Sequence, residues 1–128
     1  MDVRPRPLLA RASDCMDLKR DPEVTVTGVL TTQLFAGPPN FESIAGGDAE
    51  ERALILELPR RTCADDGEFI ASDTSFDRVH ISSYAPAILD RLNAAVGRQV
   101  TVHGEAFGAQ TAHHRAPLVL FADRVTVR

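Results

Sequence analysis

Aromatic rings, basic charge and long apolar runs are all scarce in this 128-residue sequence. Aromatic residues make up 5% of the chain, and its formal net charge is -4. Binding to nucleic acid needs a basic surface and, for single strands, rings on which bases stack. We therefore expect no nucleic-acid partner. The longest apolar runs, such as PLVLFA at 117–122, fall far short of the ~20 residues of a membrane-spanning helix, so no membrane span is expected.

The sequence motifs of common enzyme classes are also missing. Ser43 lies in NFESI rather than in the G-x-S-x-G turn of hydrolases. Neither the phosphate-binding G-x-x-x-x-G-K-[ST] nor the zinc-binding H-E-x-x-H occurs. Because no set of residues has a catalytic spacing, the sequence favours a binding module over an enzyme and predicts no cofactor.

The only cysteines are Cys15 and Cys63, and neither belongs to a C-x-x-C pair. Both lie in charged or turn-like sequence, SDCMD and RTCADDG, which is unusual for buried free thiols. A disulfide between them explains this setting and implies an oxidising compartment, periplasmic or extracellular. The apolar stretch before Ala10-Arg11-Ala12 is too short for a signal peptide, so a signal was either removed or never present.

Hydrophobic spacing predicts an extended arm over residues 1–22 and one domain over 23–128. Alternating apolar residues indicate strands, and the i, i+3, i+4 spacing after residue 83 indicates a helix. We expect Ser82 or Ser83 to cap this helix, with Pro86 in its first turn and Gly97 after its end. The expected strands cover residues 23–35, 52–59, 76–83, 98–107 and 117–128, and the helix covers 83–97.

Three strands, a helix and two further strands form the order of the OB-fold, a five-stranded, partly open Greek-key barrel. A long first strand with a glycine at its centre, Gly28, agrees with this mostly β fold class. The alternative is an α+β sandwich with the helix on one face.

In an OB-fold the loops 36–51 and 108–117 would frame one ligand-binding face. Pro38 and Pro39 stiffen the first loop, which lowers the entropy lost on binding. Alternatively, Phe41 and Ile44 only pin this loop to the barrel while Glu42 caps a turn. The ligand-binding candidates in the two loops are Pro39, Asn40, Phe41, Glu42, Ser43, Thr111, His113 and His114.

The histidines raise a second hypothesis, a metal site formed by His103, His113 and His114 with Glu42. Adjacent residues in extended backbone point to opposite sides, so His113 and His114 alone do not form such a site. The alternative is one loop-bonded and one solvated histidine. We expect His80 to be ordinary strand surface and the Glu50-Glu51 pair to be solvated.

Two segments resemble a bacterial family of small exported OB-like proteins of unknown function. The first is VTVTGVLTTQLFA followed by GPPNFESIAGGD, which matches the family's G-P-P-N-[YF]-E-S-I signature. The second is GRQVTVHG followed by TAHHRAP, which matches its T-[GA]-H-H segment. The resemblance implies an exported, disulfide-bonded protein but no activity, and it singles out residues 37–44 together with Thr111, His113, His114 and Pro117.

Together these features predict a non-catalytic envelope or secreted module that presents loops 36–51 and 108–117 to a protein or a small polar ligand. An inhibitor or immunity-type protein is a specific form of this hypothesis. The alternative is a metal-binding protein or metal-dependent enzyme that uses His103, His113, His114 and Glu42.

Overall fold

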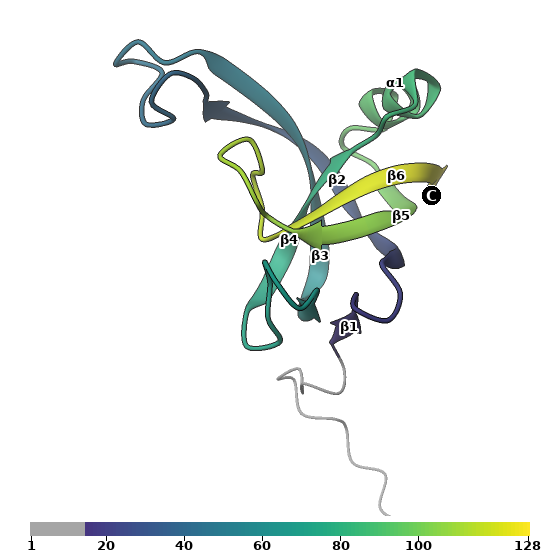
Figure 1. Cartoon of the computed structure of the whole chain (residues 1–128). Helices are drawn as coiled ribbons and strands as arrows, with labels where there is room; N and C mark the ends of the chain where they lie inside the picture. The colour runs from purple at the N-terminus through teal and green to yellow at the C-terminus, as the bar shows by residue number, and fades with distance from the viewer. Residues whose placement is uncertain (1–14) are drawn as a thin grey trace, which may run out of the picture.

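The computed structural model describes residues 15–128 and forms a β-barrel with one helix at its end (Figure 1). Within that range the elements are β1 (Met16–Asp17), β2 (Glu23–Ala36), β3 (Glu50–Asp65), β4 (Ser75–Ser82), α1 (Pro86–Ala94), β5 (Gln99–Gly108) and β6 (Leu118–Val127).

Strand pairing closes the barrel. β2 runs antiparallel to both β3 and β5, and β5 runs antiparallel to β6. β4 then pairs antiparallel with β3 and parallel with β6, which completes the ring β2–β3–β4–β6–β5. With α1 between β4 and β5, this is the topology of an OB-like barrel, so the predicted fold class is confirmed.

The barrel interior is filled by the apolar residues that alternate along the strands. Each of the strands β2 to β6 contributes at least one fully buried side chain, and Leu92 of α1 closes one end at 0% exposure. The other large, fully buried side chains of this cluster are Leu30, Leu56, Phe76, Val79, Ile81, Val100, Val102, Leu118 and Leu120.

Gly28 allows β2 to approach β3 closely. A Cβ at position 28 would lie 2.3 Å from the carbonyl oxygen of Glu57, so no larger residue fits without moving backbone. Gly28 also lies next to the point where β2 changes its partner strand. The pairing of β2 with β5 ends at Val29, and its pairing with β3 begins at the same residue. The glycine at the centre of this long strand therefore permits the close approach of two backbones.

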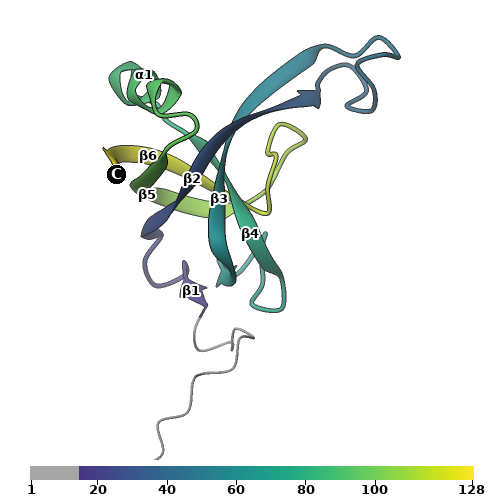
Figure 2. The same ribbon diagram turned by 180° about the vertical axis from the view of Figure 1, so that it is seen from behind.

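Beyond Thr32 of β2 and before Leu54 of β3, these two strands run on past the barrel as a two-stranded hairpin (Figures 1 and 2). Both views show this hairpin and the loop between β5 and β6 on the same side of the molecule, away from β1. The barrel thus positions the two loops that the sequence singled out.

A disulfide joins Cys15 to Cys63, as predicted. Next to it, β1 pairs in parallel with the end of β3 through Met16 and Asp17, and Leu18 is buried at 6% exposure. Residues 15–22, the described part of the predicted arm, are therefore attached to the barrel. Residues 1–14 of that arm lie outside the described residues.

The start of α1 differs from the prediction. Its N-cap is Ala85, which has no side-chain cap, and Pro86 occupies the first turn. The prediction that Ser82 or Ser83 caps the helix is wrong, because the helix begins later in the chain. The buried hydroxyl of Ser83 accepts the N–H of the N-cap residue Ala85, at 3.1 Å, and donates to the Ala122 carbonyl, at 2.6 Å. Among residues 15–128, no helix has the length and apolar character needed to cross a membrane.

Candidate functional site

The two loops are joined by the carboxylate of Glu51, at the start of β3. Its Oε1 accepts hydrogen bonds from Nε and Nη2 of Arg115, at 3.1 and 2.7 Å. Its Oε2 lies 2.8 Å from Nδ1 of His113. Arg115 also donates from Nη2 to the Ala36 carbonyl at 2.9 Å, so one guanidinium holds both ends of the hairpin loop.

This ion pair is largely shielded from solvent. The side chain of Arg115 is 10% exposed and that of Glu51 is 24% exposed. Burial by itself would raise the pKa of Glu51, but the hydrogen bonds and charges of Arg115 and His113 outweigh it and lower the pKa. The expectation of a solvated Glu50-Glu51 pair is therefore wrong for Glu51, although Glu50 is exposed.

Aromatic rings pack around the same guanidinium. The central carbon of Arg115 lies 5.0 Å from the ring centroid of Phe35 and 5.4 Å from that of Phe41. His113 meets Phe41 edge to face, with centroids 5.1 Å apart at 87°. Cation–π attraction and the ion pair thus act together at one point, and Phe41 helps to hold the loops as well as being a ligand candidate.

Asp48 organises the hairpin loop from inside. Its carboxylate accepts backbone N–H bonds from Asn40, Glu42 and Ser43 at 2.8 to 3.0 Å. These donors, Ser43 first, lower the pKa of Asp48, so the buried carboxylate is charged and holds the turn. The loop is therefore shaped before any ligand arrives, by more than the two prolines.

The loop between β5 and β6 is held by His114. Its Nδ1 accepts N–H bonds from Gln110 at 2.8 Å and Thr111 at 3.3 Å. Burial, and then the charge of neighbouring His113, lowers the pKa of His114 and favours the neutral ring that such acceptance requires. His114 thus serves the fold of its own loop.

This loop covers the outer face of β3 and β4, which is the face that OB-folds generally use for ligands. Ala116 packs there against Ala53 and Ile55 of β3, and Phe35 joins this cluster from β2. The backbone N–H of Arg115 donates to Nδ1 of His80 at 3.1 Å, and burial is the main cause that lowers the pKa of His80. His80 is therefore not ordinary strand surface.

What remains open to solvent is the tip of each loop. Of the predicted ligand-binding residues, His114 and Phe41 are half-buried and engaged in packing. The exposed ones are Pro39, Asn40, Glu42, Ser43, Thr111 and His113.

The predicted metal set is not brought together. His103, on β5, has Asp123 at 2.7 Å from Nδ1 and Glu23 at 3.4 Å from Nε2, whereas His113 contacts Glu51. Within residues 15–128, the group of possible ligand atoms lying within 4.8 Å of one another belongs to Glu23, His103 and Asp123. In this group Asp123 faces Nδ1 of His103 and Glu23 faces Nε2, and neither His113, His114 nor Glu42 of the predicted set belongs to it.

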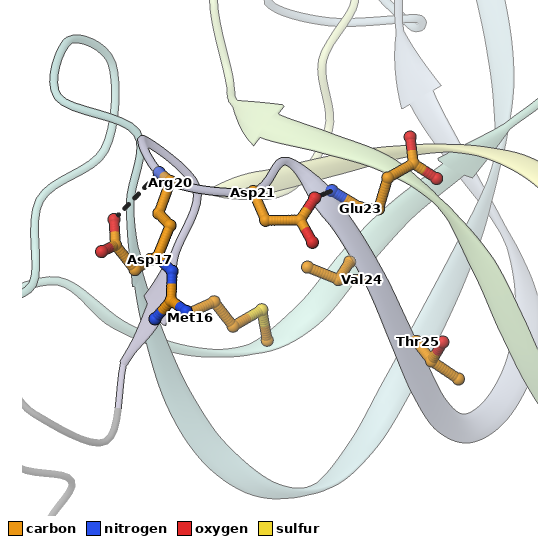
Figure 3. A pocket seen from close by; sticks show the side chains of 7 residues that line it. All are labelled: Met16, Asp17, Arg20, Asp21, Glu23, Val24 and Thr25. Atoms are coloured by element: carbon orange, nitrogen blue, oxygen red, sulfur yellow. Dashed lines mark hydrogen bonds between the residues drawn. The ribbon is translucent and has the colours of Figure 1, made fainter.

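A pocket of about 490 Å³ lies elsewhere, between β1 and the start of β2 (Figure 3). Asp17 and Asp21 accept backbone N–H bonds there, from Arg20 and Glu23 respectively, and so shape the turn that forms the pocket wall. Its lining residues are Met16, Asp17, Arg20, Asp21, Glu23, Val24 and Thr25, none of which is a predicted ligand-binding residue.

Sequence reasoning missed Arg115 and Glu51, which join the loops, and Asp48, which shapes the hairpin loop. Each is a single charge in a polar loop, and no local pattern separates a paired charge from a solvated one. The H-H-R-A-P segment was found through its histidines, but the structure gives the central position to the arginine that follows them.

Comparison with known proteins gives a partial family match and a distant structural one. A domain of unknown function (DUF4431) matches residues 78–126, which covers the T-A-H-H segment but not the G-P-P-N-F-E-S-I signature. No curated protein matches the chain. A structure described as "Plasmodium falciparum SSB complex with ssDNA" matches with 12% identity and a TM-score of 0.37, over 84% of this chain and 92% of that one. A similarity of that size carries no inference about a ligand.

Proposed function

We propose that this chain is a non-catalytic binding module that presents the tip of its β2–β3 hairpin and its β5–β6 loop to a protein partner. The observation that carries the proposal is the bridge from Glu51 to Arg115 and His113. It fixes the two loops against each other while their tips stay exposed. A surface that is fixed before binding loses less conformational entropy when a partner arrives.

The composition of the tips fits a protein partner. Ile44 offers an apolar side chain at 37% exposure, next to the polar and charged Ser43 and Glu42. An apolar contact with a polar rim is the usual make-up of a protein–protein interface. An inhibitor or immunity-type protein, which inserts a stiff loop into its target, is a specific form of this proposal.

We also propose an exported location, periplasmic or secreted. The disulfide between Cys15 and Cys63 supports it, because such bonds persist mainly in oxidising compartments.

The test is site-specific photo-crosslinking in cells that produce the protein. A photoreactive residue replaces Glu42 in the loop tip or, as a control, exposed Asp90 on α1. We expect an adduct with one protein from position 42 and not from position 90. Adducts from both positions, or from neither, would contradict the proposal.

The captured partner is then purified and its affinity measured against matched variants. Ile44→Ser should weaken binding by roughly tenfold or more if Ile44 lies at the interface centre. Val96→Ser removes a similarly exposed aliphatic side chain, 39% exposed, beyond the end of α1 and should leave the affinity unchanged. Equal effects of the two substitutions would show that the loop tip is not the contact.

A further inference from the structure

A second surface lies outside the two loop tips, at Tyr84, in the short link between β4 and α1 (Figure 1). Tyr84 is 87% exposed, compared with 48% for Phe69 and 45% for Leu34, two other exposed large apolar side chains. It nevertheless stacks on Phe121 of β6, with ring centroids 4.4 Å apart and an interplanar angle of 24°. Large exposed aromatic side chains of this kind are enriched at interfaces.

The stack continues across the outside of the barrel. Phe121 is also stacked on Phe107 of β5, with centroids 5.7 Å apart at 21°, and Phe107 meets the edge of His114 at 5.5 Å. The rings of Tyr84, Phe121 and Phe107 therefore form one column, here called the aromatic column. Its members come from three separate segments, and its Tyr84 end is open to solvent.

Tyr84 is held in place although it is exposed. The hydroxyl of Ser83 donates to the Ala122 carbonyl at 2.6 Å and accepts the N–H of Ala85 at 3.1 Å. The residue before Tyr84 is thereby bonded to β6, and the residue after it is bonded to Ser83. Pro86, the next residue, further restricts the backbone. A fixed ring loses little conformational entropy when a ligand stacks on it.

The charge beside the aromatic column is mainly negative. Glu105 lies opposite Phe121 in the β5–β6 ladder and is exposed. Within residues 15–128 its carboxylate has no hydrogen-bond or ion-pair partner. Asp123 follows two residues after Phe121, and both Asp123 and Glu23 contact His103. Arg124 is the basic residue on this stretch of β6.

We propose that the aromatic column and Glu105 bind an arginine-bearing segment of a partner protein, with the guanidinium stacked on the exposed ring of Tyr84. A guanidinium is planar, so it can stack on an aromatic face, and it also donates hydrogen bonds to a carboxylate. A lysine ammonium is not planar and therefore cannot stack on the ring in this way. A nucleotide brings phosphate charge toward the exposed carboxylate of Glu105, on a chain with net charge -4. This proposal does not depend on the loop tips being an interface.

The chain contains a built-in reporter for the test. Tyr84 is its only tyrosine and it has no tryptophan, so tyrosine fluorescence of the whole protein reports this ring alone. The probe is the peptide acetyl-Arg-Gly-Arg-amide, compared with peptides of the same length that carry lysine or uncharged citrulline. We expect a saturable change with the arginine peptide, about two- to fivefold weaker binding of the lysine peptide, and weaker binding in high salt.

Variants separate stacking from general charge attraction, with binding followed by amide chemical shifts because some of them alter the fluorophore. Tyr84→Phe should keep most of the affinity, whereas Tyr84→Ala and Glu105→Gln should each weaken it several-fold. Glu57→Gln is the control, since it removes an exposed carboxylate from β3, on another part of the barrel.

Equal binding of the citrulline peptide, or an unchanged affinity in Glu105→Gln, would overturn the proposal. So would a saturable response to adenosine monophosphate or to a glucose oligomer in the absence of any response to the arginine peptide. A fluorescence change that depends on protein concentration alone would identify a second copy of the chain as the occupant and would likewise overturn it.

Discussion

At the scale of single residues, carboxylates that accept backbone N–H bonds hold the loops of this protein. Asp48 is one example, and Asp66 is another with more such bonds. It accepts bonds from Glu68, Phe69 and Ile70 in its own turn and, through Oδ2, from Gly108 at the end of β5. Burial alone would raise the pKa of Asp66, but these donors lower it from 3.8 to about 2.

The lowered pKa predicts a pH-dependent contribution to stability. Because the folded state holds the ionised form, the contribution is present above the unfolded pKa of 3.8 and is lost as the pH falls toward the folded pKa of about 2. Asp66→Asn should cost about 1–2 kcal/mol of unfolding free energy near neutral pH, after allowance for solvent screening. Urea titrations along the pH scale measure this difference, which should shrink below about pH 4.

The control is Asp73→Asn in the same β3–β4 segment, where the side chain is exposed. It should change stability by less than about 0.5 kcal/mol. A difference between wild type and Asp66→Asn that stays constant from neutral to strongly acidic pH would show that the charge of Asp66 is not what holds the turn.

At the scale of elements, the path of β2 depends on the absence of a side chain at Gly28. A methyl group there would lie 2.3 Å from the Glu57 carbonyl oxygen, so β2 and β3 would have to separate. Gly28→Ala should lower the unfolding free energy by roughly 1–3 kcal/mol, measured by urea denaturation. Gly46→Ala in the hairpin loop places its methyl 3.3 Å from the Ser43 side chain, which is exposed and can move, so it should be nearly neutral.

The junction of the two loops is a second element-scale feature. In a double-mutant cycle of Glu51→Gln and Arg115→Met, we expect a coupling energy of about 1–3 kcal/mol, because the pair is shielded and makes two hydrogen bonds. The exposed pair Arg61–Asp77, with side chains 61% and 48% exposed, is the matched control. It should couple by less than about 1 kcal/mol, and an equal coupling in both cycles would refute a special role for the junction.

At the scale of the whole molecule, the disulfide closes a loop of 48 residues and ties the first described residues to β3. In the chain-entropy account, a loop of this length stabilises by about 4 kcal/mol. Cys15→Ala with Cys63→Ala should therefore lower the unfolding free energy by an amount of that order. Adding reductant to the wild type should produce the same loss, while the double variant should not respond to it. Intact mass shows whether the bond is present in each sample.

The strands, the helix and the disulfide could be predicted from the sequence, because the pattern that indicates each of them is local. Period-2 alternation marks each barrel strand, and the helical spacing after residue 83 marks α1, so the order of elements and the OB-like barrel followed. The two cysteines were paired because both stand in polar surroundings. Each of these signals lies within a short stretch of chain.

The candidate site could be predicted only as a meeting of two loops. Glu51 and Arg115 are 64 positions apart, and nothing near either one shows that they pair. Likewise, Ser83 looks like a helix cap in sequence, but α1 begins only at Pro86, and the Ser83 hydroxyl bonds Ala85 and a carbonyl of β6. The predicted metal ligands are not brought together, and this too is decided by contacts between distant parts of the chain. His103 contacts Asp123, whereas His113 contacts Glu51.

The small cluster of Ala53, Ile55 and Ala116 with Phe35 lies apart from the barrel core. A separate apolar cluster allows its surroundings to open without unfolding the barrel, as cooperative units do in many proteins. We therefore expect amide hydrogens of the hairpin and of residues 109–117 to exchange with deuterium together, faster than those of β5 and β6. The two loops would then move together, as one unit, relative to a barrel that stays folded.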